Sequence, residues 1–489
     1  MRTPLRRFAT CAVLLLCACA SVGPDYKRPQ QAAPNAFVEA GPWKVAQPQD
    51  TIARGHWWES FNDPVLNDLE ARALKQSPDL KAAAARVLQA QAIAGITGSF
   101  LYPELDLVSS GFRYGVSGNR PDQPSKAPLN APYAANDFRV PLYATYEVDV
   151  WGRVRRLVEA ADARFEASVA AYYTVLLTLQ GDVAQTYFLL RANDDLLRIL
   201  RENIELRRQG RDVVDARKRG GLASDLDLAR AEAALASTQA LAEAAAKTRA
   251  ELVYRLAVLT GTLPEQFQVA EAPFAITPPA IPVGLPSDLL QRRPDIAEAE
   301  RRLAARNAEI GVAKAAYFPS ITLTAAVGYE SSELSDLLKR DSSIWALGGF
   351  LFEPIFTAGR IGFDVDRAKA AYDENLAIYQ ARILQGFQEV ESALAGLRIL
   401  DQQAKYQAVA VTNADKATKL AYARYKAGLV ALIEVLDAQS VSLQAERDAL
   451  FVTSNQLLTT IALIKALGGG WEGRPMPTPN MPAPLATAK

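Results

Sequence analysis

Apolar residues recur every seven positions along two long stretches of the chain. The stripe in the first stretch consists of Val169, Leu176, Val183, Leu190, Leu197 and Ile204, and the second consists of Leu376, Ile383, Val390 and Leu397. A seven-residue apolar repeat is typical of helices that supercoil against neighbouring helices. The pattern therefore predicts two long, coiled helical regions.

The distribution of proline supports the same division. No proline occurs in residues 142–263 or in residues 355–474, and a proline breaks the interior of a helix. We predict one helix from Arg153 to Arg219, which at 1.5 Å per residue would be roughly 100 Å long. An ordinary α-solenoid or helical bundle is the simpler alternative for these helices.

The second half of the chain repeats the first. At an offset of 216 residues, Ser77–Leu80 matches Arg293–Ile296, and Tyr102-Pro103 matches Phe318-Pro319. At an offset of 207 residues, Gly152-Arg153 matches Gly359-Arg360, and Gly221-Leu222 matches Gly428-Leu429. The smaller offset places nine extra residues in a loop of the first copy, within Gly115–Asn136. We therefore predict an internal tandem duplication, with structural repeats at 64–263 and 287–467 joined by a proline-rich connector at 264–286.

Between the helical stretches, the sequence changes to the alternation of β-strands. Four strands are predicted, at about 105–114, 138–148, 321–329 and 344–352, two in each repeat. Each is close to the ~9–11 residues that a strand needs to cross a membrane. Because four strands are too few to close a barrel and lipid does not tolerate open sheet edges, the pattern favours a barrel shared between copies of the chain. Soluble hairpins are the alternative for any single strand.

The first residues have the pattern of an export signal. Three arginines precede an apolar run that ends at Leu16 and is well under the ~20 residues of a membrane span. The segment Leu16–Cys19 resembles a bacterial lipobox, with an unusual Cys17 at position −2. We expect a lipoprotein signal peptide at 1–18 and a lipid on Cys19, with a short anchor helix as the alternative.

The segment after the signal peptide and the C-terminal tail lie outside the two predicted repeats. An extended, lipid-anchored segment is expected at 19–63, and the Gly/Pro-rich tail at 468–489 is expected to be disordered. No later run reaches about 20 uninterrupted apolar residues, so no further transmembrane helix is expected.

Composition offers little for catalysis. The 489 residues include 54 basic and 54 acidic side chains, and this zero balance argues against a nucleic-acid partner. The one histidine is His56, and all three cysteines lie in the first nineteen residues. No zinc site or catalytic triad can be drawn from the body of the chain, so no metal, cofactor or enzymatic activity is expected. We expect Trp57 and Trp58 to pack the N-terminal segment onto the helices. For His56 we expect a structural role, with a role as a ligand as the alternative.

Six segments are informative together. They are Val22–Pro29, Trp57–Pro64, Tyr146–Arg153, Leu289–Ile296, Tyr317–Ser320 and Phe356–Arg360. In these segments the chain resembles the outer-membrane factor family, the TolC-like channels of tripartite efflux pumps, in its lipoprotein branch. The resemblance implies a mainly α-helical TolC-like fold with long coiled helical hairpins, in which four β-strands per chain complete a trimeric 12-stranded barrel.

The same resemblance implies a function and partners. It implies a homotrimer in the cell outer membrane, in contact with outer-membrane lipid, with a long periplasmic extension. Its partners would be a periplasmic adaptor protein and an inner-membrane RND-type transporter. The expected function is passive conduction of drugs or other small molecules to the exterior. A duct for type I protein secretion and a structural periplasmic lipoprotein or adaptor are the alternatives.

The resemblance also implies where the channel narrows. The family closes its periplasmic tip after Gly-Leu turns, which here contain Gly221 and Gly428. The candidate gate residues are Asp225, Asp227, Glu434, Asp437 and Tyr425. Carboxylates in a narrow pore attract cations, whereas the plainer interpretation is that each acid is a solvated charge on a helix. Val430 stands where the family often has a basic residue, so the usual salt bridge of the tip would lack a partner.

Overall fold

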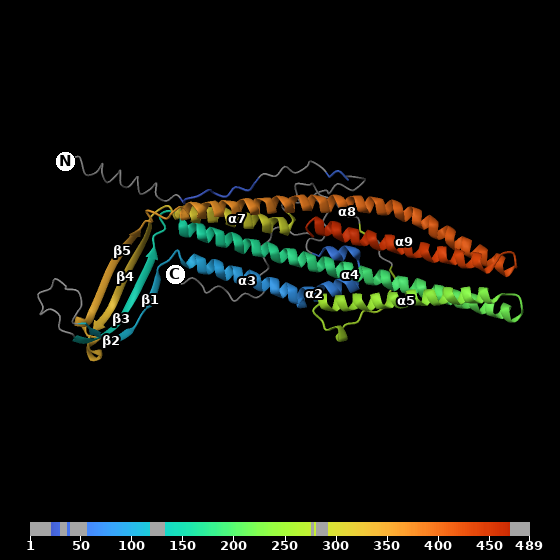
Figure 1. Ribbon diagram of the computed structural model, residues 1–489, viewed down its shortest axis with the longest axis horizontal. Helices are drawn as coiled ribbons and strands as arrows, with labels where there is room; N and C mark the ends of the chain where they lie inside the picture. Colours follow the sequence, from blue (N-terminus) through green and yellow to red (C-terminus); the bar gives the residue numbers. More distant parts are fainter. Residues whose placement is uncertain are drawn as a thin grey trace. The chain divides into compact units, whose positions relative to one another are not determined.

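The computed structural model describes residues 21–29, 37–39, 56–117, 133–274, 278–279 and 292–469. These residues are mainly helical, with one antiparallel sheet, as predicted (Figure 1). They fall into two compact units. The sheet unit contains Leu88–Ala167, Glu300–Ile378 and the described part of Met1–Pro29. The helical unit contains the described parts of Gln30–Val87, Ser168–Ala299 and Tyr379–Lys489.

Two pairs of long helices dominate the chain. Helix α4 spans Arg153–Arg219 and helix α8 spans Arg360–Lys426, each with 67 residues. Each is followed by a helix of 35 residues, α5 at Asp225–Leu259 and α9 at Leu432–Ala466. The bounds predicted for the first long helix are confirmed. Because both pairs have the same lengths and the same offset of 207, they also confirm the internal duplication.

The shorter helices repeat as well. Helix α3 at Pro78–Ser99 and helix α7 at Pro294–Ala315 both have 22 residues and differ by 216 positions. Helix α2 spans Pro64–Gln76, and all three begin at a proline, which has no N–H to leave unpaired in a first turn. The 3-10 turns are η1 at Trp57–Phe61, η2 at Pro264–Gln266, η3 at Leu334–Asp336 and η4 at Arg340–Ser342.

The sheet belongs entirely to the sheet unit. Its strands are β1 at Glu104–Leu107, β2 at Ser110–Val116, β3 at Tyr133–Glu147, β4 at Ser320–Ser331 and β5 at Ser343–Phe352. All neighbours are antiparallel, in the order β1-β3-β4-β5, and β2 pairs with β3 beyond the end of β1. The sheet therefore has four strand positions, two from each repeat.

The predicted strand at 105–114 is wrong in one respect, because the structure divides it at Val108 and Ser109. The register is the same on both sides of the gap. Val108 donates its N–H to the carbonyl oxygen of Pro141 at 3.2 Å. Pro141 has no N–H to return to Val108, so one bond of the ladder is missing and the strand is interrupted there.

The core of the helical unit explains the heptad pattern. Val183, Leu190 and Val390 are fully buried, together with aromatic residues of the N-terminal turn. Trp57 and Trp58 are buried as predicted, and the indole of Trp57 donates to Gln180 at 3.3 Å. His56 stacks on Trp58 with ring centroids 4.9 Å apart, and its Nδ1 lies 3.0 Å from Oε1 of Glu59.

Helix α9 is the one described helix that is long and apolar enough to span a membrane by length and composition. Its apolar window is 44% buried, and Leu457, Ile461 and Leu463 lie in the core of the helical unit. We therefore interpret α9 as a core helix.

Several predicted features are not tested. The signal peptide, Cys19 and most of the tail at 468–489 lie outside the described residues. The ends of the predicted repeats, connector and anchored segment stay predictions.

Candidate functional site

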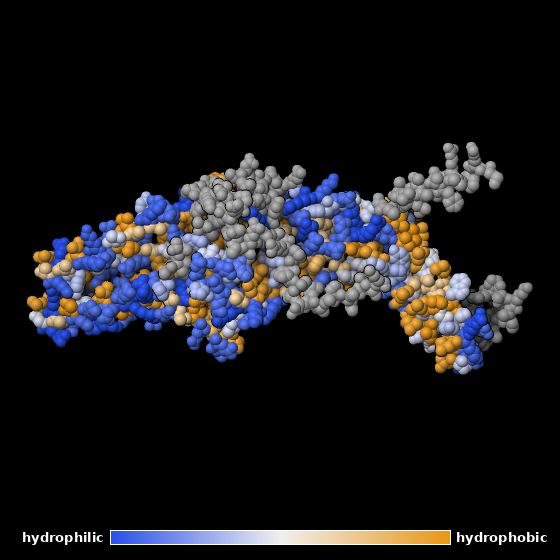
Figure 2. All heavy atoms as spheres, turned by 180° about the vertical axis from the view of Figure 1, so that it is seen from behind, coloured by the Kyte–Doolittle hydropathy of each residue, from blue (hydrophilic) through white to orange (hydrophobic). Residues whose placement is uncertain are grey.

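The sheet has an apolar face. Leu142 on β3 lies opposite Leu107 on β1 and opposite Val327 on β4, and Val327 lies opposite Trp345 on β5. Directly paired residues point to the same side of a sheet. The exposed apolar side chains of this face are Leu105, Leu107, Leu142, Leu323, Val327, Tyr329, Trp345, Leu347 and Leu351. Figure 2 shows hydrophobic side chains gathered over the sheet. An exposed apolar patch that covers four strands is typical of a membrane or protein interface.

Charged and hydroxyl side chains gather on the opposite face. Arg139 on β3 contacts two carboxylates there, those of Asp137 and Glu330, each at 2.9 Å. Glu104, Asp106, Thr145, Glu147, Thr322 and Thr324 share this side of the sheet by register. The exposed rings of Phe112, Tyr143, Phe350 and Phe352 lie on this side as well. One face of the sheet is therefore apolar, and the other is mixed and holds most of the charged groups, as a wall between lipid and water requires.

Both outer edges of the sheet are open. Strands β1 and β2 lie on one edge and β5 on the other, and no described strand pairs with their outer sides. Unpaired backbone N–H and C=O groups along an edge form a template for a strand from another chain.

The two helical turns have the same backbone structure. Gly221 and Gly428 have φ angles of 72° and 76°, the left-handed region that favours glycine. The N–H of Leu222 donates to the carbonyl oxygen of Arg217 at 2.8 Å, and the N–H of Leu429 donates to the carbonyl oxygen of Arg424 at 3.0 Å. Both turns lie at the same end of the helical unit (Figure 1). Leu222 and Leu429 themselves are exposed.

The acidic residues of the first turn already have partners. Oδ1 of Asp225 lies 2.5 Å from Nζ of Lys218. Asp227 accepts hydrogen bonds from the hydroxyl and the N–H of Ser224 at 2.8 and 3.2 Å, and its own N–H donates to that hydroxyl at 3.1 Å. These bonds from Ser224 lower the pKa of Asp227. Asp227 is therefore half of a capping box that starts α5.

The acidic residues of the second turn are free of such contacts. Ala431 stands where the first repeat has Ser224, so α9 has no side-chain cap. Glu434 and Asp437 are exposed, and no described residue forms an ion pair with either. They lie three positions apart, on one side of α9.

Tyr425 is buried beneath Arg217. The guanidinium Cζ of Arg217 lies 4.5 Å from the centre of the Tyr425 ring. Arg217 also donates to the carbonyl oxygens of Tyr425 and Lys426 at 3.4–3.5 Å. Val430 packs against the cluster that contains Tyr425. Arg217 is not among the residues predicted from the sequence, although a basic residue in the last turn of a helix is a known signal for contact with carbonyl groups.

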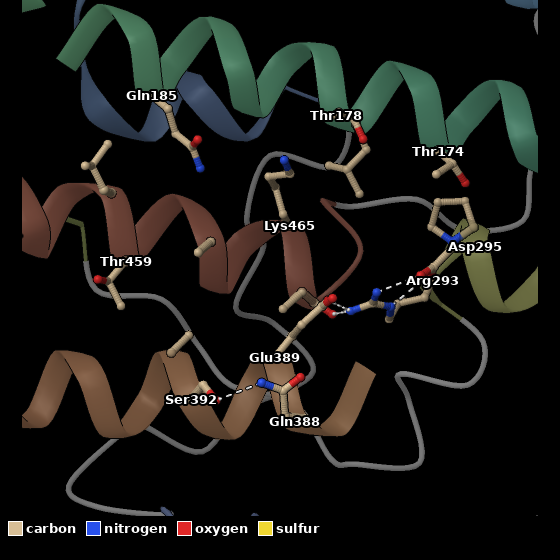
Figure 3. A pocket seen from close by; sticks show the side chains of 16 residues that line it. Thr174, Thr178, Gln185, Arg293, Asp295, Gln388, Glu389, Ser392, Thr459 and Lys465 are labelled. Atoms are coloured by element: carbon tan, nitrogen blue, oxygen red, sulfur yellow. Dashed lines mark hydrogen bonds and ion pairs between the residues drawn. The ribbon is translucent and has the colours of Figure 1, made fainter. Parts of the chain in front are cut away.

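A groove of about 660 Å³ lies between α4, α8 and α9 in the helical unit (Figure 3). Arg293 donates to Asp295 at 3.0 and 2.7 Å, to Glu389 at 2.6 Å and to the Ala466 carbonyl at 3.1 Å. With these four hydrogen bonds, its guanidinium joins the start of α7 to α8 and α9. Among the described residues, no group of three or more His, Cys, Asp or Glu could hold a metal ion.

Comparison with known proteins gives consistent matches. The family model described as outer membrane efflux protein matches residues 69–262 and 285–469. The pyoverdine export outer membrane protein OpmQ of Pseudomonas aeruginosa is 35% identical, over 94% of this chain and 96% of its own. The toluene efflux pump outer membrane protein TtgF of Pseudomonas putida is 34% identical, over 92% and 94%.

Solved structures agree. The outer-membrane channel OprN superposes with a TM-score of 0.85 and 28% identity, over 93% of this chain and all of its own. The open state of the MtrE outer membrane channel of Neisseria gonorrhoeae gives a TM-score of 0.80 and 30% identity, over 92% and 98%.

Proposed function

Because the chain belongs to the outer membrane efflux protein family, we propose that it is the outer-membrane exit duct of a tripartite efflux system. It would passively conduct drugs or other small molecules from a periplasmic pump to the exterior, without catalysis. The observation that carries this proposal is the open-edged sheet with an exposed apolar face and with most of its charged groups on the other face. Such a sheet is suited to a barrel wall between lipid and an aqueous channel.

The duct would be a homotrimer. One chain supplies four strand positions and two open edges, whereas even a small closed barrel needs about eight strands. Three chains would give twelve strands and remove every edge. Their apolar faces would contact outer-membrane lipid, and Arg139 with its carboxylate partners would face the channel.

The duct would work with two other proteins, a periplasmic adaptor and an inner-membrane RND-type transporter. The relatives named for pyoverdine export and toluene efflux support this assignment. Leu222 and Leu429, exposed beside the glycines of the two turns, are suited to contact with a partner.

A lipid on Cys19 would add an anchor to the same membrane. The described segment that follows Cys19 is firmly held, because Val22 donates its N–H to the carbonyl oxygen of Trp151 at 2.9 Å. Asp25 forms an ion pair with the buried Arg156 at 2.7 Å. This segment therefore supports an anchor close to the sheet.

The turns would form the periplasmic constriction. Glu434 and Asp437 are the strongest candidates for an acidic ring, because their carboxylates have no other described partner. Asp225 and Asp227 would add negative charge there, but Asp225 also forms an ion pair with Lys218, and Asp227 also caps α5. Tyr425 would hold the turns together rather than line the pore, because it is buried.

Outer-membrane fractionation without boiling, followed by crosslinking, tests the proposed function. We expect the full-length protein in the outer-membrane fraction as a crosslinked trimer. A soluble monomer would contradict the proposal. Conductance in planar bilayers is a second readout, since an assembled duct should form channels.

A further inference from the structure

A second pocket, in the sheet unit, lies where helices give way to the sheet. It has a volume of about 510 Å³ and is lined by Val22, Lys314, Tyr317, Phe318, Gly362, Val365, Asp366 and Lys369. Phe318 precedes the first residue of β4 by two positions, and Gly362 lies in the first turn of α8. The pocket is thus at the boundary between the helices and the sheet.

We propose that this junction pocket binds the headgroup of an anionic phospholipid, through its phosphate. The proposal rests on the proposed function, which inserts the sheet into the outer membrane and brings this boundary to the level of the lipid headgroups. The acyl chains would then extend along the apolar face of the sheet.

The charge of the pocket suits a phosphate. Lys314 lies in the last turn of α7, and no described carboxylate forms an ion pair with it. Lys369 is 3.2 Å from Asp366, but this pair is on the surface, with the two side chains 54% and 70% exposed. A surface pair contributes little and can rearrange around a ligand. Two lysines and one aspartate leave a net positive charge for one phosphate.

The aromatic residues of the pocket suit a membrane boundary. Phe318 stacks on Trp151 with centroids 4.8 Å apart, and the Trp151 indole donates to the Pro319 carbonyl at 2.8 Å. Tyr317 is half exposed beside this fixed pair. Phe356, just before α8, and Phe363, in the first turn of α8, are strongly exposed. Aromatic residues with one apolar and one polar contact favour the zone between headgroups and acyl chains.

The third wall of the pocket is the segment after Cys19. Val22 accepts a hydrogen bond from Nε of Arg156 at 3.3 Å, and the Pro24 carbonyl accepts one from Asn307 at 2.8 Å. A Cβ added to Gly23 would come within 2.4 Å of Cα of Gly311, so the segment is pressed directly onto α7. Val22 is therefore a fixed wall of the pocket.

The first repeat lacks the same chemistry. Positions that match Lys314 and Lys369 are Gly98 and Asp162, by the offsets of 216 and 207. The two lysines therefore belong to one junction only; the first repeat has Arg155 at the position of Gly362, and Arg155 forms an ion pair with Asp149 at 3.2 Å.

Native mass spectrometry of the purified full-length protein in detergent micelles tests the proposal, with dioleoylphosphatidylglycerol as the added lipid. The variant Lys314→Gln/Lys369→Gln removes both charges. Each lysine near an anionic lipid surface strengthens the attraction about fivefold, so we expect retention to weaken about 25-fold. The matched control is Lys416→Gln/Lys419→Gln on α8, the helix that also contains Lys369. Lys416 is exposed, and Lys419 pairs with Asp415 at 2.7 Å.

The outcomes separate the hypotheses. Equal retention of the lipid by both double variants would overturn the headgroup site. Displacement of the lipid by inorganic phosphate at the same concentration would also overturn it, because the site would then recognise phosphate alone. A protein that fails to assemble in the outer membrane refutes the proposed function, whereas an assembled trimer with unaltered lipid retention refutes this inference only.

Discussion

The guanidinium of Arg217 lies over the ring of Tyr425, with Cζ 4.5 Å from the ring centre. Arg217 belongs to α4 and Tyr425 to α8, so this one contact joins the equivalent helices of the two repeats. It lies within one turn of the end of both helices. Any opening of the duct by separation of the two turns would have to break it.

Replacing Arg217 should therefore favour the open duct. A cation–π contact of this kind is worth about 1 kcal/mol, so we expect Arg217→Ala to raise the open probability in planar bilayers about fivefold. Arg217→Lys should give an intermediate value, because an ammonium lacks the planar stacking surface. The matched control is Arg219→Ala, which removes an exposed arginine paired with Asp215. Unchanged gating in Arg217→Ala would show that the contact does not hold the turns closed.

The acids of the second turn should control ion selectivity. We expect Glu434→Gln/Asp437→Asn to lower the permeability ratio of K⁺ to Cl⁻, because carboxylates near the channel axis attract cations. The thermal stability of this double variant should equal that of the wild type, since neither carboxylate has a described hydrogen bond. Glu243→Gln, an exposed acid on α5 far from the turn in sequence, is the control. A selectivity equal to that of the control would remove both residues from the constriction.

Asp227 should instead control the start of α5. Loss of its capping box in Asp227→Ala should cost about 1 kcal/mol, and Ser224→Ala should cost a similar amount. The lowered pKa of Asp227 means that this stabilisation is present above the normal aspartate pKa and is lost as the pH falls through the lower, folded value. Hydrogen exchange of the backbone amides in the first turn of α5, compared between the variants and the wild type at one pH, measures the loss of stability. Additive effects in the double variant would show that the two residues do not act as a pair.

These contacts show where the sequence was informative. The proline-free stretch and the glycines of the turns were enough to predict α4, because a long helix depends on local signals. The capping box was also readable, as serine followed three residues later by aspartate. The Arg217–Tyr425 contact was not readable, because it depends on how two turns 207 residues apart pack together. The break at Val108 was missed for the same reason, since its cause is Pro141 on the neighbouring strand.

The buried Glu70 should make stability depend on pH. Neither of its carboxylate oxygens has a described hydrogen-bond partner, and burial raises its pKa well above the normal value. The neutral acid is thus favoured in the folded state, so stability falls as the pH rises from the normal glutamate pKa through the folded value.

The variant Glu70→Gln removes this charge. We expect it to be more stable than the wild type by roughly 1–3 kcal/mol at pH 8, with the difference vanishing near pH 4. Thermal unfolding across this pH range measures it, with Glu265→Gln on the surface as control. A difference that is the same at both ends of the range would mean that Glu70 does not titrate on unfolding.

Gly328 should be essential for the sheet. It lies opposite Pro141, and an added Cβ would come within 2.4 Å of both Cα of Pro141 and the carbonyl oxygen of Val140. Because these are backbone atoms, β3 and β4 would have to move apart, at a cost of roughly 1–3 kcal/mol. In Gly328→Ala we expect a lower yield of the trimer that survives detergent without boiling. Gly115→Ala on β2, where a Cβ would meet nothing within 4 Å, should leave the yield unchanged. If both variants assemble equally well, the close approach of Gly328 to Pro141 does not limit formation of the barrel.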